Sequence, residues 1–214
     1  NKNKGYGYIR YNTASGLFSD KIKDGKLNFQ FLINDVPRCL VHSFTKTDLT
    51  KNLPDQTDHN FVFFRDYIPR YSTSAAVVIQ GVKDIESTSL TTMWTVLGFP
   101  LTSIAIPVWL TDDGSLPKIL IADETGNAPL CNLALGLKEK VLSEQNDAKE
   151  NYLNLPALMN KENTGVRQKL NPIEDEVLNK AEEKISNWEK TEFNSNEAKE
   201  FYNWIDNDIY PQLK

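Results

Sequence analysis

Three apolar runs rich in β-branched residues lie in the middle of the chain and constrain its fold more than any other feature. They are Thr73–Val82, Leu90–Leu97 and Ser103–Leu110. The polar stretch Lys83–Ser89 separates the first two runs, and the tripeptide Gly98–Pro100 separates the second from the third. Strand-forming runs joined by short, turn-rich connections are typical of neighbouring antiparallel strands. We therefore expect a three-stranded antiparallel meander as the core of the fold.

The alternation of side chains within these runs predicts how the sheet is covered. In the second run Thr92, Trp94 and Val96 share one face, because successive strand residues point to opposite sides. The other face of this run and both faces of the third also carry apolar residues, which favours a sheet covered on both sides. Pro107 cannot donate to a ladder, so the third run is expected to be an edge strand or to be bulged there.

Helical spacing appears on both sides of the meander. After a flexible lead-in at Gly5–Tyr8, the expected helices are Ile9–Phe18, Asn28–Leu40, Leu130–Leu142 and two that start at the capping residues Asn171 and Asn194. Short strands are expected at Phe61–Phe64 and Lys118–Ala122, with a loop over Thr45–Asn60 and turns at Asp24-Gly25 and Asp112–Gly114. From about Gln145 the composition shifts to Lys, Glu and Asn, so we divide the chain into a first part, 1–144, and a helical extension, 145–214, packed on it.

Composition and charge exclude several classes of function. The net charge of −5 gives no basic stripe for nucleic acid. No segment approaches the roughly 18 apolar residues that a membrane span needs. The cysteines and histidines are Cys39, Cys131, His42 and His59, and their separations match no common ligand spacing. We therefore predict no metal and no cofactor. The two cysteines could pair, but two are too few to indicate a disulfide scaffold or a compartment.

The thiols and imidazoles are candidate catalytic groups. Cys39 and His42 are three residues apart on an expected helix, so a thiol–imidazole dyad is conceivable. Packing is the preferred interpretation of Cys39, because catalytic partners usually come from separate elements. Cys131, beside an apolar stripe, is interpreted as structural, and His59 as a solvated loop residue.

The acidic and aromatic residues also have a simpler interpretation. A cation site could be built from Asp112, Asp113, Asp123 and Glu124, but their spacing fits no calcium loop and Asp is a common turn residue. The acids between Glu174 and Glu200 are interpreted as solvated helix faces. Tyr71, Trp94 and Trp109 could line an apolar pocket, although at strand spacing they are more often core residues.

Three arginines are each flanked by aromatic or apolar residues: Arg10, Arg65 and Arg70. A guanidinium beside aromatic rings can hold a carboxylate or an oxyanion with two parallel hydrogen bonds. The same side chain can also lie at the surface with only its stem packed. The residues alone favour the surface interpretation.

The amino-acid sequences of several segments, in order along the chain, resemble those of a known family. The segments are Gly5–Tyr11 before a helix, Arg70–Thr73, Val77–Val82, Thr91–Trp94 and Leu97–Pro100. Together they resemble the C-terminal half of N-terminal-nucleophile (Ntn) hydrolases of the isopenicillin N acyltransferase group, which are more distantly related to choloylglycine hydrolases and penicillin V acylases. The resemblance covers roughly residues 5–142.

This resemblance implies a fold and a chemistry. The fold is α+β, a four-layer αββα sandwich to which this chain contributes the C-terminal portion, with the helical pair at its end. The activity is hydrolysis or acyl transfer at a linear amide, through a Cys exposed at a new N-terminus by self-cleavage. That Cys is expected upstream of Asn1, in an N-terminal fragment of the same precursor, because neither Cys39 nor Cys131 matches its position. The substrate is a small-molecule amide.

The resemblance also implies which residues act. In the choloylglycine relatives, an Arg in the segment that Arg10 matches lies close to the nucleophile. Arg10 is therefore expected to position the nucleophile or to stabilise the tetrahedral intermediate, and Tyr11 is the second candidate. The alternative is a non-catalytic binding or scaffold subunit of a larger assembly, in which Trp94, Trp109 and the C-terminal helices present a partner surface.

Overall fold

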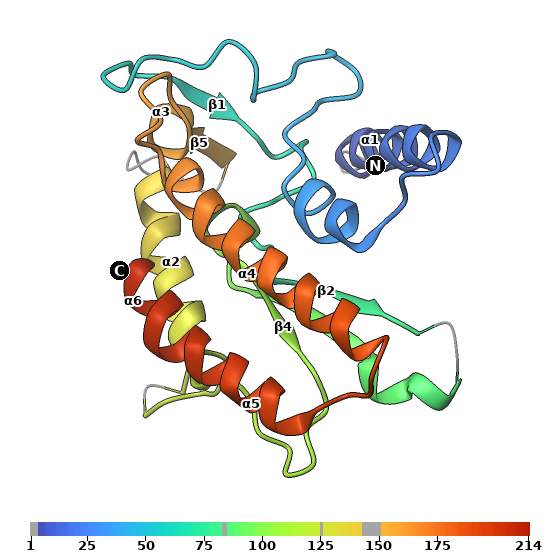
Figure 1. Cartoon of the computed structure of the whole chain (residues 1–214). Helices are drawn as coiled ribbons and strands as arrows, with labels where there is room; N and C mark the ends of the chain where they lie inside the picture. The colour runs from blue at the N-terminus through green and yellow to red at the C-terminus, as the bar shows by residue number, and fades with distance from the viewer. Residues whose placement is uncertain (1–3, 83–84, 125, 143–150) are drawn as a thin grey trace.

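The computed structural model describes residues 4–82, 85–124, 126–142 and 151–214, which form a mixed α+β fold with two small antiparallel sheets (Figure 1). The larger sheet contains β2 (Ala75–Gln80), β3 (Thr92–Leu97) and β4 (Ala105–Val108), paired antiparallel in the order β2-β3-β4. The predicted meander is therefore confirmed. Pro107 lies on an edge strand, as its missing N–H requires.

The C-terminal helices cover one face of this sheet. Helix α4 (Val166–Trp188) crosses the strands, and α5 (Ser195–Trp204) continues through the π-helix η6 (Ile205–Ile209) into α6 (Tyr210–Gln212) (Figure 1). Asn194 caps α5 as predicted, because its Oδ1 accepts the first free backbone N–H groups of that helix. One hydrophobic core joins the sheet to these helices and so contains side chains from both 1–144 and 145–214.

The two strand-associated tryptophans lie inside this core. Trp94 stacks on Phe29, and Trp109 packs edge-to-face against Trp188 and Phe201. Both indoles are almost fully buried, which confirms the core interpretation and removes them from any partner surface. Burying side chains of this size contributes about 1.5–3 kcal/mol each, so this cluster is a major source of stability.

The opposite face of the sheet is open along β2. Val77 is 52% exposed, Ile79 is 69% exposed and Met93, which pairs with Ile79, is 38% exposed. Val108, in the same cross-strand row, is buried. The prediction of a sheet covered on both sides is therefore right for β4 but wrong for β2. Among the described residues β2 pairs only with β3, which leaves its other edge open.

A second, smaller core lies under the two-stranded sheet of β1 (Phe61–Phe63) and β5 (Tyr152–Asn154), next to the short α3 (Leu155–Leu158). The expected strand at Phe61–Phe64 is confirmed. The expected helix at Leu130–Leu142 is confirmed as α2 (Pro129–Val141).

The structure differs from expectation in the N-terminal segments. Helix α1 (Lys4–Lys23) is longer than expected and includes the whole lead-in, Gly5–Tyr8, that was predicted to be flexible. In residues 28–40 the helical part is limited to residues 29–35, which include the π-helix η1 (Phe31–Asp35), because Pro37 lacks the N–H that a continuing helix would need. The loop over 45–60 contains no helix or strand, as predicted.

Two further expectations were wrong. Residues 118–122 do not form a strand: they contain the short 3₁₀ helix η4 (Lys118–Leu120), whose first N–H groups bind the Asp206 carboxylate. Helix α4 begins at Val166 and not at Asn171, so Pro172 lies inside it. Other 3₁₀ segments in the described part of the chain include η2 (Ile85–Leu90) and η3 (Pro100–Thr102).

Candidate functional site

The three arginines singled out in the sequence converge where α1 approaches the segment after β1. Arg10 Nη1 donates to the backbone carbonyl of Arg65 at 2.8 Å. Burial, and then the neighbouring Arg70, lower the pKa of Arg10, while Asp66 raises it. The guanidinium nevertheless remains charged at neutral pH. Arg10 therefore lies within electrostatic range of two other guanidiniums, those of Arg65 and Arg70, and of the Asp66 carboxylate.

Asp66 also faces a histidine. His42 Nε2 lies 3.8 Å from Asp66 Oδ2, and His42 Nδ1 accepts the backbone N–H of Thr45 at 3.1 Å. That acceptance places the proton of neutral His42 on Nε2, toward the carboxylate. The other carboxylate oxygen, Asp66 Oδ1, is buried without a hydrogen-bond partner among the described residues. His42 Nδ1 is therefore engaged by the backbone, while Nε2 faces Asp66 beyond hydrogen-bond distance.

Tyr11 does not join this cluster. Its side chain is 69% exposed, and it makes no hydrogen bond or ring contact within the part of the chain that the structure describes. Arg10 is half-buried on the neighbouring position of the same helix. Only one of the two residues expected to act is therefore held in place by its surroundings.

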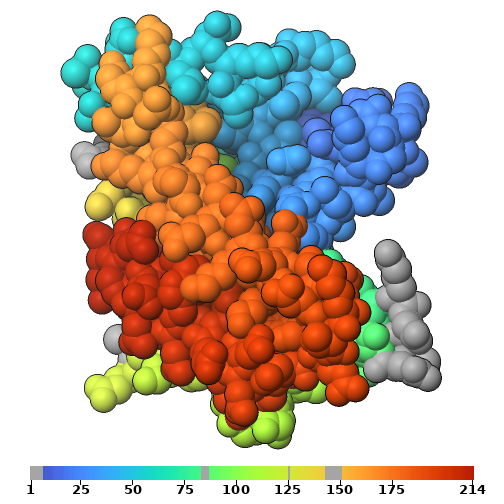
Figure 2. All heavy atoms as spheres, viewed as in Figure 1, coloured from blue at the N-terminus to red at the C-terminus, as the bar shows by residue number. Residues whose placement is uncertain are grey.

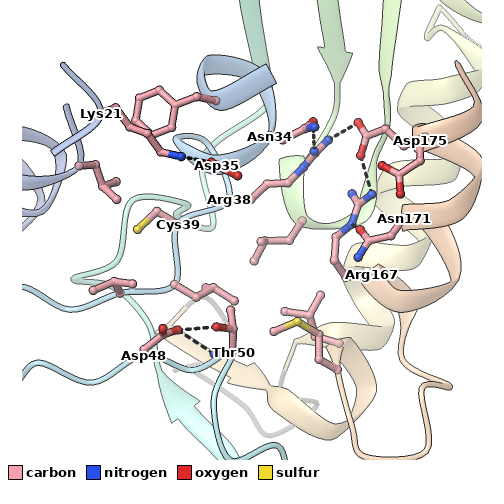
Figure 3. A pocket seen from close by; sticks show the side chains of 18 residues that line it. Lys21, Asn34, Asp35, Arg38, Cys39, Asp48, Thr50, Arg167, Asn171 and Asp175 are labelled. Carbon is pink, nitrogen blue, oxygen red and sulfur yellow. Dashed lines mark hydrogen bonds and ion pairs between the residues drawn. The ribbon is translucent and has the colours of Figure 1, made fainter. Parts of the chain in front are cut away.

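A second candidate site is a pocket of about 500 Å³ between α1, η1 and α4 (Figure 3). In the space-filling view, the blue N-terminal segments and the orange α4 segment meet along this region (Figure 2). One end of the pocket is a buried network of three charged side chains: Arg38 Nη2 lies 2.7 Å from Glu174 Oε1, and Arg167 Nη2 lies 2.6 Å from Glu174 Oε2.

Backbone groups complete this network. Arg38 Nε donates to Pro100 O, and Arg167 Nη1 donates to Ser103 O. The backbone N–H of Ala105, at the start of β4, donates to Glu174 Oε1 at 2.5 Å. Burial, followed by the charge of the other guanidinium, lowers the pKa of Arg167 to about 10. The network therefore ties α4 to η1 and to the segment that enters β4.

Sequence reasoning missed this network. Glu174 was interpreted as a solvated acid near a helix start, yet it is buried in the middle of α4. A signal was present, since Glu174 falls on the apolar stripe defined by Leu170, Val177 and Ala181 at helical spacing. An acid on an apolar stripe needs a buried cation. Arg38 and Arg167 carried no such signal.

The cysteines do not form the conceivable catalytic arrangements. Cys39 and Cys131 are both free thiols, so they do not pair with each other. Cys39 lies after η1 and not on a helix, where it lines the pocket, and burial raises the pKa of its thiol. His42 contacts Asp66 and Tyr67 instead. A raised thiol pKa disfavours the thiolate that a nucleophile requires.

Most other acids are explained by local pairing. Lys199 on α5 bridges Asp112 at 2.8 Å and Asp113 at 3.0 Å, which fixes the predicted turn against the helix. The ion pair between Lys184 and Glu197 is similarly peripheral. Tyr71 lies at the surface over the Lys138 ammonium, so it is not the core residue that was expected.

Within the described ranges, no group of three or more His, Cys, Asp or Glu side chains is placed to hold a metal ion. None of the described helices is long and apolar enough to cross a bilayer. Comparison of the chain with protein-family models, with curated proteins and with solved structures gave no match.

Proposed function

We propose that this chain is the C-terminal portion of an N-terminal-nucleophile amidohydrolase or acyltransferase that acts on the C–N bond of a small-molecule amide. The nucleophilic Cys belongs to an N-terminal fragment of the same precursor. That fragment supplies the second sheet of a four-layer αββα sandwich. The described residues supply the sheet β2-β3-β4 and the helices on its covered face.

The observation that carries the proposal is the open apolar face along β2. Soluble proteins rarely expose a contiguous apolar surface without a partner. Val77, Ile79 and Met93 form such a surface on a sheet whose other face already has its helical layer. A second sheet packed about 10 Å above it would bury these side chains, as in other two-sheet sandwiches. The resemblance of Val77–Val82 and Thr91–Trp94 to the Ntn group points to the same partner.

The second support is the environment of Arg10. Arg10 is held by its bond to the Arg65 carbonyl, and its guanidinium lies near those of Arg65 and Arg70. Preorganised positive charge of this kind stabilises the oxyanion of a tetrahedral intermediate once a nucleophile and a substrate carbonyl are placed beside it. Arg10 is the residue to which we assign that role, and Tyr11 is the secondary candidate.

The experiment uses the precursor that includes the upstream segment. We expect a fragment that begins with Cys by mass spectrometry, and hydrolysis of at least one member of a panel of N-acyl amino acids, bile-salt amides and penicillins. Arg10→Ala should lower kcat/KM by about 10²–10³-fold. Lys23→Ala, which removes a positive charge from the exposed end of the same helix, should leave it unchanged. Absence of both a Cys-first fragment and any hydrolysis would refute the proposal.

The open face can be tested separately from activity. In Ile79→Cys, the new thiol should react rapidly with a maleimide in the isolated 214-residue chain and at least tenfold more slowly in the precursor. Equal labelling in the two would show that no layer covers β2.

The rival function is a non-catalytic binding or scaffold subunit. Its support is that Cys39 and His42 do not form a nucleophile–base pair, since Cys39 is a buried thiol with a raised pKa and His42 faces Thr45 and Asp66. Its partner surface cannot include Trp94 or Trp109, which are buried. A precursor with a protected Ile79→Cys thiol but without a Cys-first fragment or hydrolysis would favour this function.

A further inference from the structure

We propose that the pocket between α1, η1 and α4 binds a small organic carboxylate with an apolar body, whose carboxylate group bonds to the remaining donors of Arg38 and Arg167. This inference does not rest on the proposed amidohydrolase function, because Arg10 and its neighbours are not part of this pocket.

The first argument is the number of hydrogen-bond donors at the closed end of the pocket. A guanidinium has five N–H groups. Arg167 uses three of them, on Asn171, Ser103 O and Glu174, and so keeps two without an acceptor among the described residues. Arg38 uses four and keeps one. Buried donors without acceptors are costly, and the two oxygens of a carboxylate match them.

The balance of buried charge also favours an anion at the closed end of the pocket. Two guanidiniums share the single carboxylate of Glu174, so one positive charge is uncompensated where the side chains are buried. Three aspartates also line the pocket, and of these Asp175 acts on Arg167. Asp48 pairs with Lys51, and Asp35 pairs with Lys21. Asp175 attracts the Arg167 guanidinium, but its side chain is exposed, so water screens that charge. An anion at the closed end therefore has a charge to neutralise.

The rest of the pocket lining is largely apolar. The walls include the apolar side chains of Leu17, Phe31, Leu40, Leu158 and Met159. A pocket of about 500 Å³ lies within the range of small-molecule sites. Figure 3 shows Arg38 and Arg167 converging at one end, with Cys39 and Asp48 toward the other. A ligand with one anionic end and an apolar chain of medium length fits this polarity.

The test is calorimetric titration of the 214-residue chain with octanoate, octan-1-ol and octylamine. We expect one site for octanoate, with a Kd at least tenfold lower than for either other compound. Leu17→Trp, which fills the pocket from α1 without touching the arginines, should abolish octanoate binding. Ile22→Trp, on an exposed position of the same helix, is the matched control and should bind like the wild type.

Two further variants separate this site from unspecific adsorption and guard against misfolding. Asp175→Asn removes a negative charge near the arginines and should tighten octanoate binding about two- to threefold. Ile79→Asp, on the open sheet face, should leave binding unchanged. If thermal unfolding shows that Leu17→Trp is not folded, Met159→Trp blocks the pocket from the opposite wall. The proposal is overturned if octanoate does not bind, if octanol binds equally well, or if a folded pocket-filling variant still binds.

Discussion

The buried network around Glu174 makes a strong prediction about stability. In Glu174→Gln the side chain keeps its shape but loses its charge. One of its two terminal positions becomes an NH₂ donor, and this donor then faces Arg38 or Arg167, whose donors now lack an acceptor. Breaking a buried ion pair by removing one partner costs about 3–5 kcal/mol, because the remaining charge stays buried. We expect a loss of that size in the free energy of unfolding.

The assay is urea unfolding followed by tryptophan fluorescence, since Trp94, Trp109 and Trp188 are all buried. At about 2–4 °C per kcal/mol for a chain of this length, the melting temperature should fall by roughly 6–20 °C. Glu197→Gln is the matched control. It removes the same charge from a pair with Lys184 whose carboxylate is 40% exposed, and should cost at most about 1 kcal/mol. A loss below about 1 kcal/mol in Glu174→Gln as well would refute the reasoning.

Three further predictions concern Gly98, Asp113 and Tyr202. Gly98→Ala should destabilise the protein by roughly 1–3 kcal/mol in chemical unfolding, because Gly98 has a φ of +80° and a Cβ there would lie 2.6 Å from a methyl group of α2. The bonds of Asp113 to its own turn and to Lys199 lower its pKa, so its stabilising effect is complete above the unfolded pKa and is lost as the pH falls through the folded one. Unfolding curves of wild type and Asp113→Asn should therefore differ at pH 6 and converge in strong acid. Burial raises the pKa of Tyr202, which bonds to the Trp109 backbone, to about 12, and it also raises the pKa of Tyr67. Ultraviolet titration of Tyr202→Phe should therefore lose a late-titrating tyrosine, and the stability that Tyr202 contributes should decline above pH 10.

The meander was predictable from the sequence because local and tertiary preferences agree there. The runs around β2, β3 and β4 are β-branched, their connections contain turn residues, and Pro107 marks an edge. The incomplete cover of β2 was not predictable, since Val77 and Ile79 look the same whether a neighbouring layer is present or not. The apolar stripe of α5 and its Asn194 cap were also predictable, because local and tertiary preferences agree there too.

The errors arose where tertiary contacts overrode a local signal. Asn171-Pro172 has the composition of a helix start, but α4 begins five residues earlier. Arg167 and Glu174 are seven residues apart on one side of α4 and form an ion pair there. Pro172 lies between them, and the helix continues through it without a break. Lys118–Ala122 is apolar enough for a strand, yet Asp206 caps its first turn from a distant helix. At the candidate sites, sequence suggested Arg10 but could not reveal that Arg38 and Arg167 meet Glu174.

The position of α4 and α5 at the end of the chain has a consequence for synthesis on the ribosome. The sheet is complete once Val108 has emerged, but the helices that cover its tryptophan face end only near Trp204. At roughly 5–20 residues per second, about 5–20 s pass before that cover exists. During this interval the nascent chain exposes Trp94 and Trp109 to the cell, and chaperones that bind emerging apolar segments have that long to engage it.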